Sequence, residues 1–175
     1  MTLDLDTPAP TLPSPEREEE VWLPPLLLRE SGRLFGIAVT ILRDPGEAED
    51  AVQETLARAW DRHASLRDRS SIRGWLTRIC INYCISRRRQ LVRLPRPLWD
   101  GPRPALASWD LDGAALDLDR AYASLSVRQR AALLLFYQHG YSVEECAELM
   151  SCAPGTVRSH IARALTALRK EMRDA

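Results

Sequence analysis

Residues 142–165 carry the side chains best suited to reading DNA. Ser142-Val143-Glu144-Glu145 is a capping box that opens a helix ending near Met150, and Ser151-Cys152-Ala153 is a short turn. Pro154 then stands at the first position of a longer basic helix. Its N-terminal half offers hydroxyl, imidazole and guanidinium groups: Thr156, Arg158, Ser159, His160 and Arg163. This order matches the helix-turn-helix, whose second helix enters the major groove. The alternative is a plain helical hairpin with solvated arginines.

A second group of chemically useful side chains lies between Trp75 and Arg89. Asn82 precedes the basic run Arg87-Arg88-Arg89 on one helix. Positive charge can hold a DNA backbone, and flat groups can grip unstacked bases. The spacing of Trp75 and Tyr83 favours core positions for both, so DNA contact is predicted for the arginines.

A third group is acidic. In the predicted helix 47–61, Asp50, Gln53 and Glu54 stay on the polar side, opposite an apolar stripe that ends at Trp60. Carboxylates repel DNA, so this face is expected to meet a protein or, as the plainer alternative, only solvent.

No catalytic or cofactor site is predicted. The histidines His63, His139 and His160 are scattered, and a glycine-rich phosphate loop is absent from the sequence. Cys80, Cys84, Cys146 and Cys152 lack a standard zinc spacing, so they are interpreted as small buried hydrophobes and no metal is expected. The N-terminus is acidic and rich in proline, so no signal peptide is predicted. The sequence has no long apolar run, so no membrane insertion is predicted.

The elements that must position these groups are all helical. The predicted fold is all-α, with two small helical domains on a flexible linker. Residues 1–24 are expected to form a disordered acidic arm, 25–94 the first domain, 95–115 the linker and 116–175 the helix-turn-helix domain. Six prolines in the first 25 residues support the arm, and further prolines break any helix in the linker.

Turn chemistry sharpens the expected boundaries. Helical spacing begins at Leu26, and Asp44 is the predicted N-cap of the next helix, with Glu47 closing a box-like pair. Residues 61–71 have no apolar period and read as a loop. Ser126 caps a helix that Gly140 stops.

Charge is distributed unevenly along the 175 residues. The 24 basic and 24 acidic side chains cancel, which argues against a coat for nucleic acid. Residues 71–96, however, carry seven arginines and no acid, whereas residues 1–20 carry six acids and one base. Separate segments are therefore expected to have separate partners.

Taken together, three motifs resemble the extracytoplasmic-function (ECF) sigma factors of the sigma-70 family. The segment Asp44-Pro45-Gly46-Glu47-Ala48-Glu49-Asp50-Ala51-Val52-Gln53-Glu54 is similar to the family's polymerase-binding segment. Trp75-Leu76-Thr77-Arg78-Ile79-Cys80-Ile81-Asn82 resembles its tryptophan-leucine helix, and Gly155-Thr156-Val157-Arg158-Ser159 resembles its recognition-helix signature. The resemblance covers residues 26–172.

The resemblance implies a non-enzymatic RNA polymerase subunit that recognises promoters and initiates transcription in the cytoplasm. Asp50, Gln53 and Glu54 would face the polymerase core, and loop 61–71 would capture a flipped base of the minus-ten element. Asn82 and residues 87–89 would lie along that DNA, and helix 154–168 would read the minus-thirty-five element. An anti-sigma factor is a possible further partner. The alternatives are a helix-turn-helix regulator that works without polymerase, and an enzyme or metal sensor that uses the cysteines.

Overall fold

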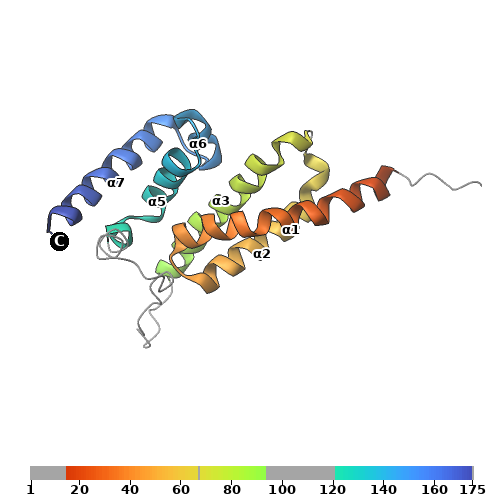
Figure 1. Cartoon of the computed structure of the whole chain (residues 1–175), viewed down its shortest axis with the longest axis horizontal. Coiled ribbons are helices and arrows are strands. Elements are labelled where there is room, and N and C mark those ends of the chain that lie inside the picture. The colour runs from red at the N-terminus through yellow and green to blue at the C-terminus, as the bar shows by residue number, and fades with distance from the viewer. Residues whose placement is uncertain (1–14, 67, 94–120, 175) are drawn as a thin grey trace, which may run out of the picture.

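Two groups of helices lie side by side in the molecule. The computed structural model describes residues 15–66, 68–93 and 121–174, and every regular element within them is helical. The first group is α1 (Pro15–Leu42), α2 (Pro45–Arg62) and α3 (Ile72–Arg93). The second is α5 (Val127–Leu133), α6 (Val143–Leu149) and α7 (Pro154–Asp174). Figure 1 shows α3 and α5 facing each other, with α7 on the outer side. The predicted all-α fold with two helical domains is confirmed.

Helix α1 corrects one predicted boundary. It begins at Pro15, so residues 15–24 are helical although the sequence placed them in a disordered arm. Proline is tolerated at a first helical position, but Pro24 and Pro25 lie inside the helix and each removes a backbone hydrogen bond. Leu23 is fully buried, one turn before the buried Leu27. Burial of Leu23 offsets part of the free-energy cost of the two prolines. In the sequence, helical spacing of apolar residues is evident only from Leu26.

Helix α2 begins as the sequence predicted. The Asp44 carboxylate accepts a hydrogen bond from the Glu47 backbone N–H at 3.0 Å, and Pro45 opens the helix. The Glu47 side chain does not complete the expected box; it extends across to α3. Buried Ala48, Ala51 and Val52 place the apolar side of α2 on α1 and α3.

The predicted loop 61–71 contains two short 3-10 turns. They span His63–Ser65 and Arg69–Ser71, on either side of Asp68. Asp68 accepts hydrogen bonds from the Ser70 backbone N–H and hydroxyl, which hold the pKa of its carboxyl below the ordinary value. The turn that precedes α3 is therefore stabilised by hydrogen bonds to the Asp68 side chain.

Capping chemistry also organises the second group. Ser126 with Gln129 and Ser142 with Glu145 form complete capping boxes at the starts of α5 and α6. After α5 the backbone widens into a π-helical turn, Leu134–Gln138, and Gly140 adopts a φ of +69°. The sequence had predicted one continuous helix up to Gly140, because residue spacing does not distinguish α from π hydrogen bonding.

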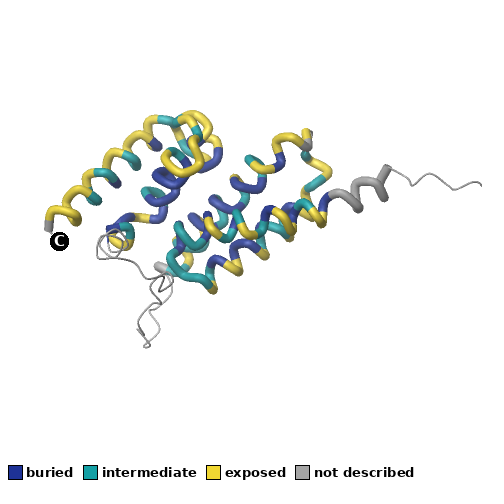
Figure 2. The backbone as a smooth tube through the Cα atoms, in the orientation of Figure 1, coloured by how far each residue is buried: buried dark blue, intermediate teal, exposed yellow. Residues whose placement is uncertain are grey.

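One hydrophobic core runs through both groups. Leu34, Ile37 and Ile81 of the first group belong to the same buried cluster as Leu135 and Met150 of the second. Helix α5 contacts α1 and α3, and α6 contacts α3. Figure 2 shows buried backbone along the facing sides of the two groups. Burial of apolar surface therefore holds the two domains together as well as each domain by itself.

Several predictions fall on residues that the structure does not describe. The linker 95–115 and the first 14 residues of the arm lie outside the described residues. The chain is helical again from Ala121. In the described ranges, no helix is long and apolar enough to cross a membrane.

The N-cap of α2 can be tested by substitution. Asp44→Ala leaves the Glu47 N–H without its acceptor and is expected to lower the free energy of unfolding by about 1 kcal/mol. Urea denaturation followed by circular dichroism measures the change. Asp44→Asn is the matched control, since it keeps the cap acceptor and should stay close to wild type. Equal destabilisation by both variants would show that the charge matters and the cap does not.

Candidate nucleic-acid interface

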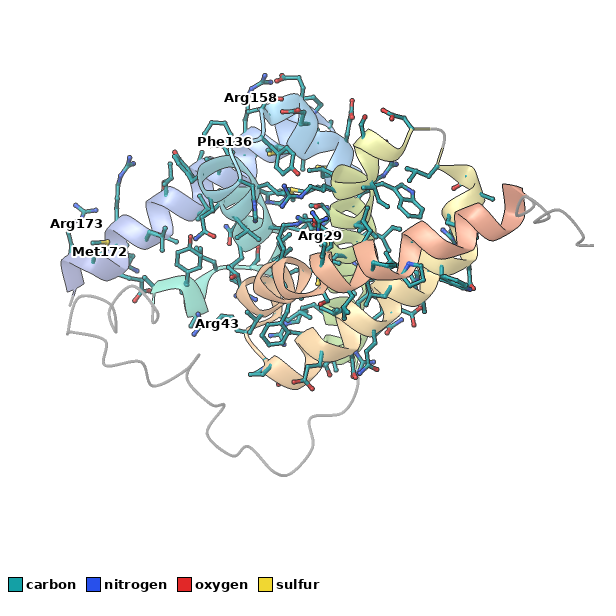
Figure 3. All side chains as sticks on the ribbon, turned by 45° about the vertical axis from the view of Figure 1, so that its right-hand side comes forward. Arg29, Arg43, Phe136, Arg158, Met172 and Arg173 are labelled. Atoms are coloured by element: carbon teal, nitrogen blue, oxygen red, sulfur yellow. The ribbon has the colours of Figure 1, made fainter. Side chains whose placement is uncertain are left out.

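The predicted recognition residues lie on one accessible part of α7. Thr156, Arg158, Ser159 and Arg163 are exposed, and His160 is half-buried. Val157 is fully buried and Ile161 packs against the core, so this side of α7 holds it on the other helices. Figure 3 shows Arg158 at the outer edge of the molecule, away from α1. Four of the five side chains can thus meet DNA without rearrangement of α7.

The turn between α6 and α7 sets their crossing. Ser151 has a φ of +51°, in the left-handed region, and the Cys152 N–H donates to the Ala147 carbonyl at 2.9 Å. Ala147 of α6 is buried where α6 contacts the rest of the domain. The hydrogen bond and the left-handed residue turn the chain from α6 into α7 within three residues, a turn length typical of a helix-turn-helix.

Arg158 has a protein partner that sequence reasoning missed. Its guanidinium lies 2.9 Å from the Glu144 carboxylate of α6, and both side chains are more than half exposed. An ion pair this exposed contributes little to stability. The ion pair does hold Arg158 beside α6, the first helix of the motif. Because the pair is solvated, Arg158 can exchange Glu144 for another negatively charged or hydrogen-bond-accepting partner.

His160 is suited to neutral hydrogen bonding. Burial lowers the pKa of its imidazole, and the nearby positive charges of Arg128 and Arg163 lower it further. The lowered pKa favours the uncharged form of the imidazole at neutral pH. Contact with a base or phosphate would then use an uncharged N–H donor.

Asn82 does not point freely into solvent. Its Nδ2 donates to the Arg78 carbonyl of α3 at 2.8 Å and to the Leu149 carbonyl of α6 at 3.1 Å. Asn82 was predicted to face the minus-ten DNA, whereas here its amide is used to contact the helix-turn-helix domain. The sequence carried no signal of this contact across 67 positions.

The three arginines after Asn82 differ from one another. Arg87 makes a bidentate ion pair with Glu47 of α2, with Nε–Oε2 and Nη2–Oε1 distances of 2.7 and 3.1 Å. Hydrogen bonding to Glu47 raises the pKa of Arg87 above its ordinary value. Arg88 is half-buried and Arg89 is exposed, and neither forms an ion pair within the described residues. Arg88 and Arg89 therefore offer the available charge, whereas Arg87 ties α3 to α2.

The predicted polymerase-facing residues lie on the outside of α2. Asp50 and Gln53 are exposed, and Glu54 is half-buried. Arg58 Nε binds a Glu54 carboxylate oxygen at 2.8 Å and its guanidinium lies 5.4 Å from the centroid of the Tyr83 ring. Asp50 and Gln53 thus remain available for a protein partner, and Glu54 is partly neutralised.

One aromatic residue near the loop, Trp60, does not lie where the sequence predicted it. Trp60 was assigned to the apolar stripe of α2, yet it is 40% exposed, with its ring 5.9 Å from that of His63. Trp75 and Tyr83 pack against the core as predicted. Trp60 stands at the end of α2, where the helix meets the loop, so a flat exposed ring lies next to the segment expected to capture a base.

Two further features are structural: the ion pairs of Glu30 in the first domain, and the four cysteines, which are divided between the two domains. Although burial raises it, Arg33 and Arg73 hold the pKa of the Glu30 carboxyl below its ordinary value. Cys80, Cys84 and Cys146 are buried free thiols, and Cys152 is half-buried. Burial raises the pKa of Cys146 to about 11, so its thiol stays protonated. Among the described residues, no group of histidine, cysteine or carboxylate side chains could hold a metal.

The Glu47–Arg87 pair is expected to couple α2 to α3 energetically. Both side chains are mostly buried, at 19% and 31% exposure, and we expect a coupling free energy of about 1 kcal/mol. A double-mutant cycle with Glu47→Ala and Arg87→Ala, read by urea denaturation, measures it. The Glu54–Arg58 pair is the matched control and should couple more weakly, since both of its side chains are more exposed. Additive effects at Glu47 and Arg87 would contradict the expectation.

Comparisons with known proteins agree with the motifs. The sequence model for Sigma-70 region 2 matches residues 26–94, and that for Sigma-70 region 4 matches residues 115–168. The chain is 30% identical over 145 residues to the ECF RNA polymerase sigma factor SigM of Mycobacterium tuberculosis, covering 83% of this chain and 74% of SigM. It is 36% identical over 138 residues to SigC of the same species, covering 74% and 72%.

Structural similarity leads to the same family. The sigma factor RpoE from Bartonella quintana, solved in complex with the anti-sigma factor NepR, superposes with a TM-score of 0.64 and 29% identity. The match covers 85% of this chain and 95% of RpoE. With regions 2 and 4 in order and relatives across most of its length, the chain belongs to the ECF RNA polymerase sigma factors of the sigma-70 family, non-enzymatic factors that act in promoter recognition and transcription initiation.

Proposed function

We propose that each domain of this sigma factor reads one promoter element through the side chains described above. Thr156, Arg158, Ser159, His160 and Arg163 of α7 contact the minus-thirty-five element. The observation that carries this assignment is the exposure of four of them on the outer part of a helix-turn-helix whose Val157 is buried. Guanidinium groups in the major groove recognise guanine by bidentate hydrogen bonds.

The first domain acts on the minus-ten element. Arg88 and Arg89 supply charge for the DNA backbone, and Asn82 and Arg87 lie beside them on α3. Exposed Trp60, at the start of the loop, adds an aromatic surface for an unstacked base. Unstacking costs a few kcal/mol for each base step, which base capture and backbone contacts must offset.

The outer face of α2 docks on polymerase core. The exposed Asp50 carboxylate disfavours DNA, Gln53 is an exposed amide, and Glu54 adds a second carboxylate to the same face. Since polymerase and promoters are the working partners of the family, we place the protein in the cytoplasm. Control by an anti-sigma factor is included in the proposal, and it is supported by the NepR complex of the similar RpoE.

Run-off transcription tests the function. Purified core polymerase, this protein and fragmented DNA from its own genome are expected to yield discrete transcripts that need the protein. Their start sites then define the promoter elements. Transcripts that do not depend on the protein, together with tight operator-like binding by the chain alone, would favour a regulator that works without polymerase.

Arg158→Ala tests the assignment of α7. The variant loses one guanidinium contact and is expected to bind the upstream element about tenfold more weakly, with lower transcript yield at the same start sites. Lys170→Ala is the matched control, because it removes a positive charge from the exposed far end of α7. Equal loss in both variants would indicate a general charge effect and would contradict base reading by Arg158.

A further inference from the structure

Helix α5 brings a positive side chain to the recognition helix, which it contacts (Figure 1). Ala164 of α7 belongs to the same small buried cluster as Leu125, and Leu125 lies three residues before Arg128 of α5. His160 is about one turn before Ala164, so it lies at the edge of the side of α7 that faces α5. Arg163 follows His160 by three residues on the same helix. Arg128, His160 and Arg163 therefore gather at the junction of α5 and α7.

The positive charges at this junction act on one another. Besides burial, the charges of Arg128 and Arg163 lower the pKa of the His160 imidazole, so both guanidinium groups lie near the ring. Within the described residues, neither arginine forms an ion pair or side-chain hydrogen bond, and the His160 ring has no hydrogen-bond partner. The other charged residue of α5, Arg130, is buried and donates to backbone carbonyls. Three donors at this junction are thus available to one negatively charged group.

The carboxylates of α6, the other helix that packs against α7, leave this positive charge uncompensated. Glu144 pairs with Arg158, and Glu145 is held in the capping box of α6. Neither of them, nor Glu148, is among the groups that shift the pKa of His160. Like charges that lie together without a counter-ion repel one another, and an anion bound between them removes the repulsion. The junction therefore favours an anionic ligand.

We infer that Arg128, His160 and Arg163 form one site for a phosphodiester group of the upstream promoter DNA, so that α5 holds the DNA backbone while α7 reads bases. The inference rests on the proposed role of α7 at the minus-thirty-five element. Guanidinium groups bind phosphate oxygens through charge-assisted hydrogen bonds, and phosphate contacts fix the register of a recognition helix on the duplex. The capping box of Ser126 and Gln129 fixes the first turn of α5, which carries Arg128.

Phosphate binding at this site depends on pH through His160. At neutral pH the ring offers an uncharged N–H donor, and a bound phosphate offsets the repulsion that Arg128 and Arg163 exert on its protonated form. The pKa of the ring is therefore higher in the complex than in the free chain. As the pH falls below neutral, the complex takes up a proton before the free chain does. Affinity for DNA accordingly rises as the pH falls through this range.

The salt dependence of DNA binding tests the contribution of Arg128. The probe is a duplex from upstream of a start site mapped by run-off transcription, bound by the protein assembled with core polymerase. Arg128→Gln is expected to weaken binding about tenfold and to reduce the slope of log affinity against log salt concentration by about one. Lys170→Gln is the matched control, because it removes a charge from the exposed far end of α7 and should leave the slope unchanged.

Neutral methylphosphonate groups, placed one at a time in the same duplex, identify the phosphate. At one position the substitution is expected to weaken binding by the wild type about tenfold and to cost Arg128→Gln little further affinity, since the partner is already lost. Additive losses at every position would overturn the inference. Changes of base sequence should weaken binding by the wild type and by Arg128→Gln to the same extent, because phosphate contacts carry no sequence information.

Substitution of His160 tests the pH dependence of the site. Wild-type affinity is expected to rise about fivefold between about pH 7.5 and about pH 6. His160→Gln should bind more weakly and show no such rise, whereas His160→Arg should bind tightly at both pH values, a gain that misfolding cannot produce. His139→Gln is the matched control, since it removes an exposed histidine of the same domain and should keep the rise. An equal rise in His160→Gln would overturn the inference.

Failure of the site and failure of the proposed function give different results. Absence of protein-dependent complexes and transcripts would contradict the proposed function itself. Protein-dependent transcripts, combined with a salt slope that Arg128→Gln leaves unchanged, would overturn the phosphate site and leave the proposed function intact.

Discussion

A guanidinium cannot be buried without acceptors, and the buried Arg130 donates to the backbone carbonyls of Ile41, Tyr122 and Leu125. Ile41 brings the end of α1 to this side chain, while Leu125 and Tyr122 bring the segment before α5. Positive charge at the carboxyl end of a helix also interacts favourably with the helix dipole. The remaining contacts of α5 with α1 and α3, and the core that continues across them, surround this one group.

The charged side chains divide into those that hold the fold and those that remain available. The pair of Glu30 with Arg73 links α1 to α3, and the pair of Glu47 with Arg87 links α2 to α3. Arg89, Arg158 and Arg163 are exposed, and the pair of Arg158 with Glu144 is solvated. The zero net charge of the chain therefore conceals accessible positive groups on α3 and α7, which is what a protein with both DNA and protein partners requires.

Local chemistry made much of the fold predictable. The N-caps Asp44, Ser126 and Ser142 could be predicted because each interaction spans only three residues. The place of Pro154 at the first position of a helix is an equally local signal. The predicted start of α1 was wrong because the burial of Leu23 depends on tertiary packing, which the local sequence does not show. The π-helical turn at Leu134–Gln138 was missed because residue spacing does not distinguish it from an α-helix. For the site, the exposed residues of α7 followed from helical periodicity. The partners of Asn82, Arg87 and Arg130 did not, since contacts across 40 to 89 positions have no local pattern.

The packing of both domains around a single hydrophobic core underlies all of these contacts. Native-state hydrogen exchange in increasing urea measures the free energy of opening at individual amides in α3 and α5. If one core spans both domains, the most protected amides of the two helices will merge into a single unfolding transition with the same free energy and the same dependence on urea. Two transitions, with α5 opening at a much lower free energy and a smaller urea dependence than α3, would show two independent domains and contradict the account.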